Sequence, residues 1–274
     1  MTSVNTKLFF FDLDGTLLNT QKNITEQTYA ALTAWHNAGH RVAVSSGRPL
    51  FSILDTIKQQ HLDVFSPYAI AFNGAQIHEP ATGKDIWKKT LSVEDVHALA
   101  ALIREAGLYC HTYDNTHILT PREDTEIHYY TRVVKVPWRV LPDFPEGVCE
   151  RPCKMLCIDL NGPERLDVLA RQIMSDPRFT GRITAMRSNE KYLEIFPSDA
   201  GKGAAVAALA DHLGIPVQNT YAAGDAQNDV SMIEAAECGV AMCNGHPDAI
   251  AAADIVTATD NDHDGLAPIL RGNI

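Results

Sequence analysis

Two aspartates stand two residues apart, directly after an apolar run near the start of the sequence. Asp12 and Asp14 follow the run at 9–11, and Gly15 comes next. Such a run is typical of a buried strand. Residues two apart on an extended segment point the same way, so both carboxylates can face one site while Gly15 allows the chain to turn away. Because two carboxylates held together attract a divalent cation, the segment predicts a metal-dependent site.

An EF-hand calcium loop does not fit this segment. Such a loop needs Gly at its sixth position and Glu at its twelfth, whereas counting from Asp12 gives Leu17 and Asn23. The alternative to a metal site is an acidic exit from a strand into a turn. Further polar turns elsewhere in the sequence argue against that alternative, because they supply the partners that a metal-dependent site needs.

A second acidic strand end lies near the other end of the sequence. The run at 221–223 leads into Gly224, and then Asp225, Asn228 and Asp229 follow. This repeats the arrangement of the first segment, an apolar strand that ends in a cluster of acids and an amide. A second acidic strand end predicts that the two clusters share one metal ion.

Two other turns have the side chains that bind an anion. Ser46, Gly47 and Arg48 end a β-branched run, and such a turn presents hydroxyl and backbone N–H groups. Lys202 stands between two glycines ahead of a helical pattern at 205–213. Its ammonium group can neutralise a phosphate oxygen.

These four stretches, in this order, resemble the four motifs of the haloacid dehalogenase superfamily of phosphotransferases, and more narrowly its Cof-like phosphatases. The segments 72–75 (Phe-Asn-Gly-Ala) and 192–195 (Tyr-Leu-Glu-Ile) also resemble that branch. The resemblance covers nearly the whole chain. Four motifs in register are far more specific than any one of them.

The resemblance implies a role for each acid. Asp12 would be the nucleophile that forms an aspartyl-phosphate. Asp14 would protonate the leaving oxygen and then activate water as a base. Mg²⁺ would be held by the carboxylates of Asp12 and Asp225 and by the backbone carbonyl of Asp14. Asp229 would orient a metal-bound water or Lys202.

The resemblance also implies which groups bind the phosphoryl group. They are the Leu13 N–H, Ser46, the Gly47 amide, Lys202 and Asn228, with Arg48 as a further contact. Phosphoryl transfer is mainly positioning plus neutralisation of charge, which the lysine and the metal would supply. The sequence departs from the common pattern at Ser46, where threonine is frequent, and at Asp199, which we expect to compete for the charge of Lys202.

Composition excludes several classes of protein. The chain has 274 residues, 45% of them hydrophobic, and a net charge of −11, which argues against nucleic acid or an anionic membrane surface as a partner. No apolar run reaches the roughly 18 residues of a membrane span, and the start lacks signal-peptide features, so we expect a cytoplasmic enzyme. Cys149, Cys153 and Cys157 lie at intervals of four, which is not a zinc-finger spacing.

Alternating strand and helix patterns predict an α/β fold, with a doubly wound parallel-sheet (Rossmann-like) core and an inserted α+β cap domain. We expect core residues at 1–78, the cap at 79–196 and the rest of the core at 197–274. Expected strands of the cap lie at 86–90, 108–114, 117–120, 154–160 and 192–196, its helices at 93–106 and 164–175, and a proline-rich loop at 137–152.

Two minor features of the sequence carry expectations of their own. His111 and Tyr113 share one strand face of the cap, and we expect them to contact the leaving group. The acidic segment 260–265 matches the first half of a calcium loop, but its twelfth position is Arg271, and we expect a helix start capped by Asp262 or Asp264 instead.

The expected function is a Mg²⁺-dependent phosphatase for small phosphorylated metabolites. These include sugar phosphates and cofactor precursors such as phosphorylated pyrimidines, pyridoxal phosphate or flavin mononucleotide. One alternative is a phosphomutase, but the resembling mutase branch carries its cap between the first two motifs. The other is a sensor that binds Mg²⁺ and a metabolite without turnover, but a pure binder has no need for an acid such as Asp14. The number of subunits is left open.

Overall fold

The computed structural model describes residues 6–273, apart from the side chain of Val133, as two compact units. The first unit runs to Trp87 and resumes at Gly201, and the second unit is Lys88–Ala200. The change of unit comes later than the expected boundary at residue 79. The reason is that the strand at Lys84–Lys88 extends the sheet of the first unit, whereas the strand expected at 86–90 was placed in the cap.

The first unit is built on an eight-stranded sheet in the order β14-β13-β12-β1-β2-β3-β4-β5. The strands are β1 (Leu8–Asp12), β2 (Arg41–Ser45), β3 (Tyr68–Ala71), β4 (Gln76–Glu79), β5 (Lys84–Lys88), β12 (Thr220–Gly224), β13 (Cys238–Ala241) and β14 (Ile255–Val256). The pairings from β14 to β3 are parallel, and β4 pairs antiparallel with β3. This sheet confirms the predicted α/β core.

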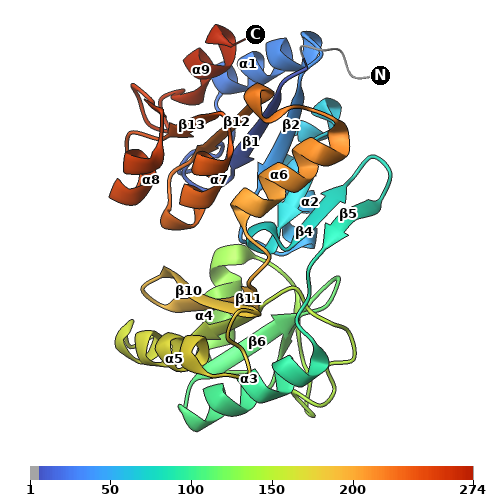
Figure 1. The fold of residues 1–274 in the computed structure, drawn as a ribbon, viewed down its shortest axis with the longest axis vertical. Coiled ribbons are helices and arrows are strands. Elements are labelled where there is room, and N and C mark those ends of the chain that lie inside the picture. Colours follow the sequence, from blue (N-terminus) through green and yellow to red (C-terminus); the bar gives the residue numbers. More distant parts are fainter. Residues whose placement is uncertain (1–5, 274) are drawn as a thin grey trace. The chain divides into compact units, whose positions relative to one another are not determined.

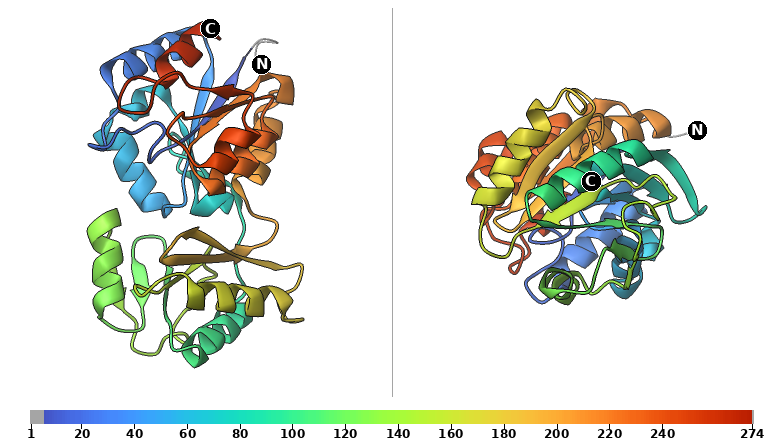
Figure 2. Two further views of the ribbon diagram at one scale, coloured as in Figure 1. Left: turned by 90° about the vertical axis from the view of Figure 1, so that its left-hand side faces the viewer. Right: turned by 90° about the horizontal axis from the view of Figure 1, so that it is seen from below.

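Helices cover both faces of this sheet (Figures 1 and 2). The helices are α1 (Glu26–Asn37), α2 (Leu50–Gln59), α6 (Lys202–Leu213), α7 (Val230–Ala235), α8 (Pro247–Ala252) and α9 (Leu266–Gly272), with 3-10 turns at Leu62–Phe65, Phe72–Gly74, Val217–Asn219 and Gln227–Asp229. Successive residues of β1 serve opposite faces. Phe9 packs edge-on against Trp35 of α1, whereas Phe10 joins the core formed with Leu209 of α6.

The second unit has a six-stranded sheet in the order β10-β11-β9-β6-β7-β8. Its strands are β6 (Tyr109–Tyr113), β7 (Ile118–Thr120), β8 (Trp138–Val140), β9 (Met155–Ile158), β10 (Ile183–Asn189) and β11 (Tyr192–Pro197). All pairings are antiparallel except the one between β7 and β8. Helices α3 (Val93–Glu105) and α5 (Glu164–Ser175) contribute to the apolar core of this unit, as the α+β prediction requires.

A third helix of the second unit, α4 (Thr125–Val134), was not predicted. Its Tyr130 packs against His111 of β6, on the face of the sheet opposite to the apolar core. The expected loop at 137–152 contains β8, so that prediction is wrong over three residues. β8 is short, lies at the edge of its sheet and is largely exposed, so its sequence gives little signal of a strand.

The expected capping of a helix by Asp262 or Asp264 is wrong. Helix α9 begins at Leu266, and its N-terminal flanking residue is Gly265, without a side-chain cap. The carboxylate of Asp262 instead accepts hydrogen bonds from the backbone N–H and the hydroxyl of Thr20. Asp262 therefore holds the loop around Thr20 by hydrogen bonds and does not cap helix α9.

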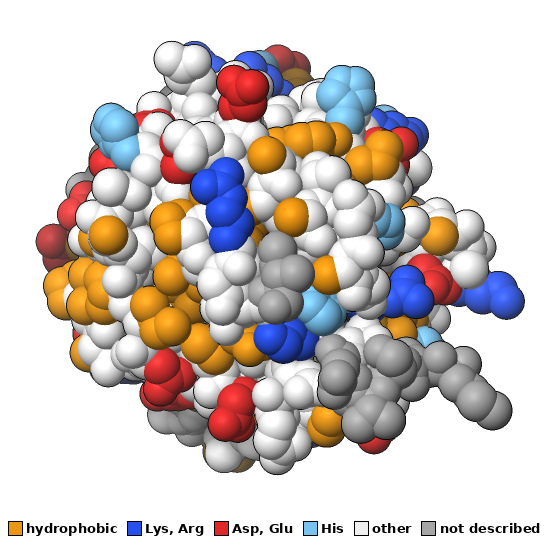
Figure 3. All heavy atoms as spheres, turned by 90° about the horizontal axis from the view of Figure 1, so that it is seen from above, with side chains coloured by type: hydrophobic (Ala, Val, Ile, Leu, Met, Phe, Trp, Pro, Cys, Tyr) orange, Lys and Arg blue, Asp and Glu red, His pale blue; other side chains and the backbone are white. Residues whose placement is uncertain are grey.

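One face of the molecule is drawn with its side chains coloured by type in Figure 3. On the face drawn in Figure 3, the described acidic, basic and hydrophobic side chains are interspersed, without a continuous basic area. Among residues 6–273, none of the helices combines the length and the hydropathy that crossing a lipid bilayer requires.

Candidate active site

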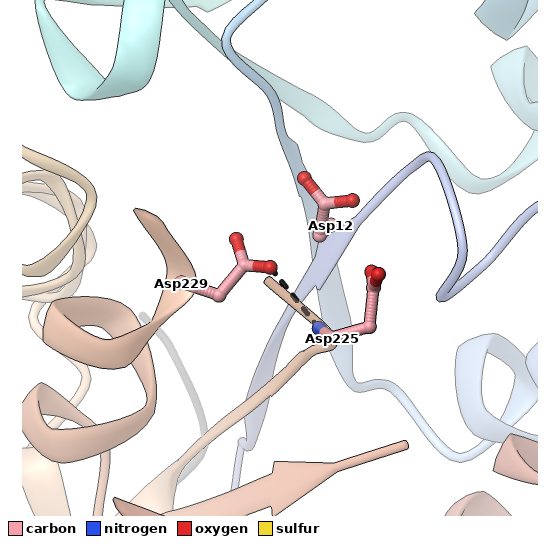
Figure 4. Close-up of side chains that lie close together, drawn as sticks. All are labelled: Asp12, Asp225 and Asp229. Atoms are coloured by element: carbon pink, nitrogen blue, oxygen red, sulfur yellow. Dashed lines mark hydrogen bonds between the residues drawn. The ribbon is translucent and has the colours of Figure 1, made fainter. Parts of the chain in front are cut away.

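Three carboxylates meet at the carboxyl edge of the first sheet. Asp12 ends β1, Asp225 follows the neighbouring strand β12, and Asp229 ends the short turn after it. Each offers an oxygen that lies within 4.8 Å of the others. Figure 4 shows the three side chains converging on one region. The parallel pairing of β1 with β12 explains this meeting, because the carboxyl ends of parallel strands lie at the same edge.

Lys202 lies among these acids. Its ammonium donates to Asp12 Oδ1 and to Asp229 Oδ1, both at 2.5 Å, and to the Ser45 carbonyl at 3.1 Å. The lysine is 1% exposed. Burial lowers the pKa of Lys202, but the attraction of Asp12 and Asp229 outweighs it, and the net direction is upward. Lys202 is therefore a buried cation that contacts both acidic strand ends, and its charged form is favoured.

The expected competition between Asp199 and the carboxylates for Lys202 is wrong. Asp199 forms an ion pair with Lys89 at 2.6 Å, and both residues belong to the second unit. The Asp199 side chain is 63% exposed. Adjacency in sequence does not bring this acid to the lysine, because α6 begins at Lys202 and its side chain is enclosed by the first unit.

Crowding raises the pKa values of two of the acids. For Asp12 the causes are burial and then the repulsion of Asp229, which the attraction of Lys202 offsets only in part. For Asp225, burial raises the pKa to about 6, although a hydrogen bond from the Thr16 hydroxyl at 2.7 Å opposes the shift. The carboxylates of the buried Asp12 and the half-buried Asp225 repel each other, and their oxygen atoms are the ligands that a hard divalent cation prefers.

Asp229 has contacts of a different kind. Its Oδ2 accepts from the backbone N–H of Asp225 at 3.1 Å and of Ala226 at 2.9 Å, while Oδ1 accepts from Lys202. A Cβ added to Gly224 would come within 2.4 Å of the Asp229 Cβ, so glycine is needed for this close approach. These contacts hold the turn closed and fix the direction of the Lys202 ammonium.

Asp14 lies on the other side of the turn after β1. Arg48 donates to it with Nε at 2.8 Å and Nη2 at 2.5 Å, and Lys22 donates with Nζ at 2.7 Å. Burial raises the pKa of Asp14, but Arg48 and Lys22 outweigh it, and the net direction is downward. Arg48, which was expected to contact the phosphoryl group, thus forms an ion pair with Asp14 in this structure.

The residues expected to bind phosphate come from adjacent turns. Ser46 and Gly47 follow β2, whose Ser45 is in register with Asp12, and the Ser46 hydroxyl accepts from the Arg48 N–H at 3.3 Å. Leu13 directly follows Asp12, and its carbonyl closes the turn by accepting from Leu18 N–H at 2.8 Å. Asn228 donates from Nδ2 to Asn73 Oδ1 at 3.0 Å.

The whole sequence has close relatives among known proteins. It matches the haloacid dehalogenase-like hydrolase family over residues 9–270. It is 33% identical over 261 residues to the protein named "Putative phosphatase YxeH" of Bacillus subtilis, and the match covers 94% of each chain. The chain belongs to the haloacid dehalogenase-like hydrolase family. It is an enzyme of the phosphatase class, as its relatives are.

Two further relatives of this haloacid dehalogenase-like hydrolase carry more specific names. The 5-amino-6-(5-phospho-D-ribitylamino)uracil phosphatase YwtE of Bacillus subtilis is 28% identical over 286 residues, with 95% of this chain and 96% of that protein covered. The solved structure of the subclass IIB sugar phosphatase BT4131 is 25% identical, has a TM-score of 0.81, and covers 98% of this chain and 100% of its own.

His111 and Tyr113 do not reach a solvent-accessible surface in this haloacid dehalogenase-like hydrolase. They are 0% and 3% exposed, and the His111 Nε2 contacts the Tyr113 hydroxyl at 3.0 Å. The Tyr113 hydroxyl in turn contacts that of Tyr130 at 2.9 Å. The expectation that the pair contacts a leaving group is wrong, because β6 places both side chains under α4 in a hydrogen-bonded cluster.

Sequence reasoning missed two polar residues at the site of this hydrolase. Lys22 lies in a turn closed by Asn19 and reaches Asp14 from a left-handed backbone conformation with φ 62°. Asn73 was noted only as part of a family resemblance. For Lys22 no sequence signal exists, whereas for Asn73 a polar residue directly after a buried strand was the available signal.

Proposed function

We propose that this chain is a Mg²⁺-dependent phosphatase that hydrolyses small phosphorylated metabolites through an aspartyl-phosphate on Asp12. The observation that carries the proposal is the buried Asp12 carboxylate, held by Lys202 and facing Asp225. A nucleophile fixed by a cation, beside a site for a second cation, is what transfer of an anionic group requires.

The residues have distinct roles in this proposal. Asp12 attacks phosphorus and forms the covalent bond, and Asp14 passes a proton to the leaving oxygen and then takes one from water. The Asp12 and Asp225 carboxylates and the Asp14 carbonyl would hold Mg²⁺, which supplies charge neutralisation between nucleophile and phosphate. Asp229 orients Lys202 through the hydrogen bond already described.

The phosphoryl group would lie against the turns after β1 and β2. The proposed donors are the Leu13 and Gly47 backbone amides, the Ser46 hydroxyl, the Lys202 ammonium and the Asn228 amide. Arg48 would exchange its contact with Asp14 for one with the phosphate, since a dianion attracts a guanidinium more strongly than a carboxylate does. Asp14 would then be released to carry a proton.

The substrate class follows from the relatives. Because one relative is named for a phosphorylated ribityl-aminouracil and another is named as a sugar phosphatase, we propose sugar phosphates and phosphorylated cofactor precursors as substrates. The net charge of −11 argues against nucleic acid or an anionic membrane surface as a partner, because binding to either needs a basic patch. Local cations at the site would then have to attract the phosphate.

The test is phosphate release from p-nitrophenyl phosphate and a panel of sugar and cofactor phosphates, with Mg²⁺ or with EDTA. We expect release by the wild type that needs Mg²⁺ and that is lost in Asp12→Asn and Asp225→Asn. Asp211→Asn, the same change at an exposed position of α6, serves as the matched control. Full activity of Asp12→Asn would refute the covalent mechanism, and product isomerisation without release would indicate a phosphomutase.

A further inference from the structure

Asn73 connects the two segments that are proposed to bind phosphate. It lies in the 3-10 turn Phe72–Gly74, directly after β3. Its backbone N–H donates to the Ser46 carbonyl at 3.1 Å, and its Oδ1 accepts from Asn228 Nδ2 at 3.0 Å. The side chain therefore lies between the turn after β2 and the turn after β12.

The backbone at this position is strained. Phe72 and Asn73 have φ of 53° and 55°, so two consecutive residues other than glycine are left-handed. Such conformations cost about 1–3 kcal/mol each and persist where the surrounding structure enforces them, often at functional sites. Asparagine tolerates this conformation better than most residues. The strain fixes where the Asn73 amide group lies.

The amide nitrogen of Asn73 is a buried donor without an acceptor. Asn73 is 4% exposed, and Nδ2 has no hydrogen-bond partner among the described residues. An unpaired buried donor is costly, by about 1–3 kcal/mol. A Cβ added to Gly47 would lie 3.4 Å from this nitrogen, so the amide is packed against the Gly47 turn.

We propose that Asn73 is a further phosphate-binding residue, whose Nδ2 donates a hydrogen bond to the phosphoryl group while Oδ1 holds Asn228. This inference rests on the proposed function, because it takes the turns around Gly47 and Asn228 as the phosphate site. A phosphoryl oxygen is the acceptor that the buried nitrogen needs, and a hydrogen bond to a charged oxygen is stronger than one between neutral groups.

Two substitutions separate phosphate binding from a structural role. Asn73→Asp keeps the size, the tolerance of positive φ and an oxygen that accepts from Asn228, but it replaces the donor by a negative oxygen. Asn73→Gly removes the amide and tolerates the left-handed backbone. His61→Gly is the matched control, because His61 is also left-handed, with φ 53°, but is exposed and takes no part in the contacts described for the site.

The readout is the dissociation constant of inorganic phosphate by calorimetry in the presence of Mg²⁺, together with KM and kcat for p-nitrophenyl phosphate. We expect both Asn73 variants to weaken phosphate binding about tenfold or more, with Asn73→Asp the weaker binder. KM should rise more than kcat falls. His61→Gly should match the wild type in both measurements.

Phosphate binding by Asn73→Asp and Asn73→Gly within about twofold of the wild type would overturn the inference, and a variant that fails to fold leaves the other one to decide. A structural role alone would leave Asn73→Asp near the wild type, since its contact with Asn228 remains. If the wild type binds phosphate but hydrolyses no ester, the proposed function fails while the effect of Asn73 on binding is still measured. If the wild type binds no phosphate, both are refuted.

Discussion

At the scale of single residues, the two aspartates after β1 have opposite electrostatic surroundings. Burial and Asp229 raise the pKa of Asp12, whereas Arg48 and Lys22 overcome burial and lower the pKa of Asp14. The proposed roles need the reverse order, an ionised nucleophile and a protonated acid. We expect bound ligands to supply it, because a divalent cation lowers the pKa of Asp12 and a phosphoryl group draws Arg48 away from Asp14.

Lys202 is the one cation that contacts both Asp12 and Asp229 among the described residues, so its replacement tests what holds these acids in place. Lys202→Met leaves Asp12 and Asp229 as two buried carboxylates without their cation. Breaking a buried ion pair on one side costs about 3–5 kcal/mol. We therefore expect a loss of that order in the free energy of unfolding, measured in urea with EDTA, and loss of phosphatase activity.

A double variant serves as the control for this prediction. Lys202→Met combined with Asp229→Asn removes one of the two carboxylates that Lys202→Met leaves without a cation, so the double variant should be more stable than Lys202→Met alone. Equal stability of the two would mean that repulsion between the buried acids is not the cause. An active Lys202→Met enzyme would contradict the phosphate-binding role of Lys202.

At the scale of secondary-structure elements, the strands that carry the site could be predicted from the sequence. β1, β2 and β12 are apolar runs that end in polar turns, and parallel pairing brings their carboxyl ends to one edge. Helix α4 was missed because most of its sequence Thr-Glu-Ile-His-Tyr-Tyr-Thr-Arg-Val-Val consists of β-branched and aromatic residues, which favour strands, although Ile127 and Tyr130 share a buried face at helical spacing. β10 was missed because its second half is exposed and polar.

Contacts between side chains of distant elements were beyond prediction from the sequence. The bidentate contact of Arg48 with Asp14 spans 34 residues, and the contact of Asn228 with Asn73 spans 155. The family resemblance implied which segments meet, but it did not give the partners of each polar atom. Those partners depend on rotamers and on turn geometry, for example the left-handed residues Lys22 and Asn73.

Strand β6 leads to a prediction on pH. His111 is fully buried, and burial, followed by the positive charge of Lys154, places its pKa well below the ordinary value. The groups that face it are Tyr109 and Tyr113 of β6, Tyr130 of α4, and Lys154 just before β9. The neutral imidazole bonds to tyrosine hydroxyls, so its protonation is disfavoured in the folded state.

The direction in which stability changes with pH follows from the difference in proton binding between the folded and the unfolded chain. In the unfolded chain His111 titrates near its ordinary pKa of about 6.5, so its contribution to stability is complete above that pH. As the pH falls below that ordinary pKa, His111 binds a proton in the unfolded chain but stays neutral in the folded chain. Stability then decreases, by at most about 1.4 kcal/mol per pH unit, until the pH reaches the lowered folded pKa.

Urea unfolding between pH 7.5 and 5, followed by circular dichroism, measures how steeply the free energy of unfolding falls with pH, and this fall per pH unit is called the slope below. The substitution His111→Gln should make it shallower, whatever its effect on stability at pH 7.5. His128→Gln, the same change at an exposed position of α4, should keep the slope of the wild type. An unchanged slope in His111→Gln would show that other groups cause the acid sensitivity.

At the scale of the whole molecule, the polar site belongs to one unit although its residues come from both ends of the chain. Asp12 precedes the second unit and Lys202, Asp225 and Asp229 follow it. The second unit has an apolar core of its own between its sheet and helices α3 and α5. A ligand of the acidic cluster therefore ties the two sequence halves of the first unit together.

This arrangement predicts how Mg²⁺ affects thermal unfolding. A ligand that binds only the folded state stabilises it by RT ln(1 + [L]/Kd), which is about 2.7 kcal/mol at a concentration one hundred times Kd. Mg²⁺ also relieves the repulsion between Asp12 and Asp225. We expect the midpoint of unfolding, measured by differential scanning calorimetry, to rise with Mg²⁺ and to return to its starting value with EDTA.

The variant Asp225→Asn separates this cause from a general salt effect. It removes one carboxylate of the pair, so its midpoint with EDTA should be higher than that of the wild type, since burial and repulsion already raise the pKa of Asp225 to about 6. Its rise with Mg²⁺ should be smaller, because the cation loses a ligand. Asp211→Asn should respond to Mg²⁺ as the wild type does. If Asp225→Asn gains as much from Mg²⁺ as the wild type, the ion binds elsewhere, and the carboxyl edge of the first sheet is not the metal site.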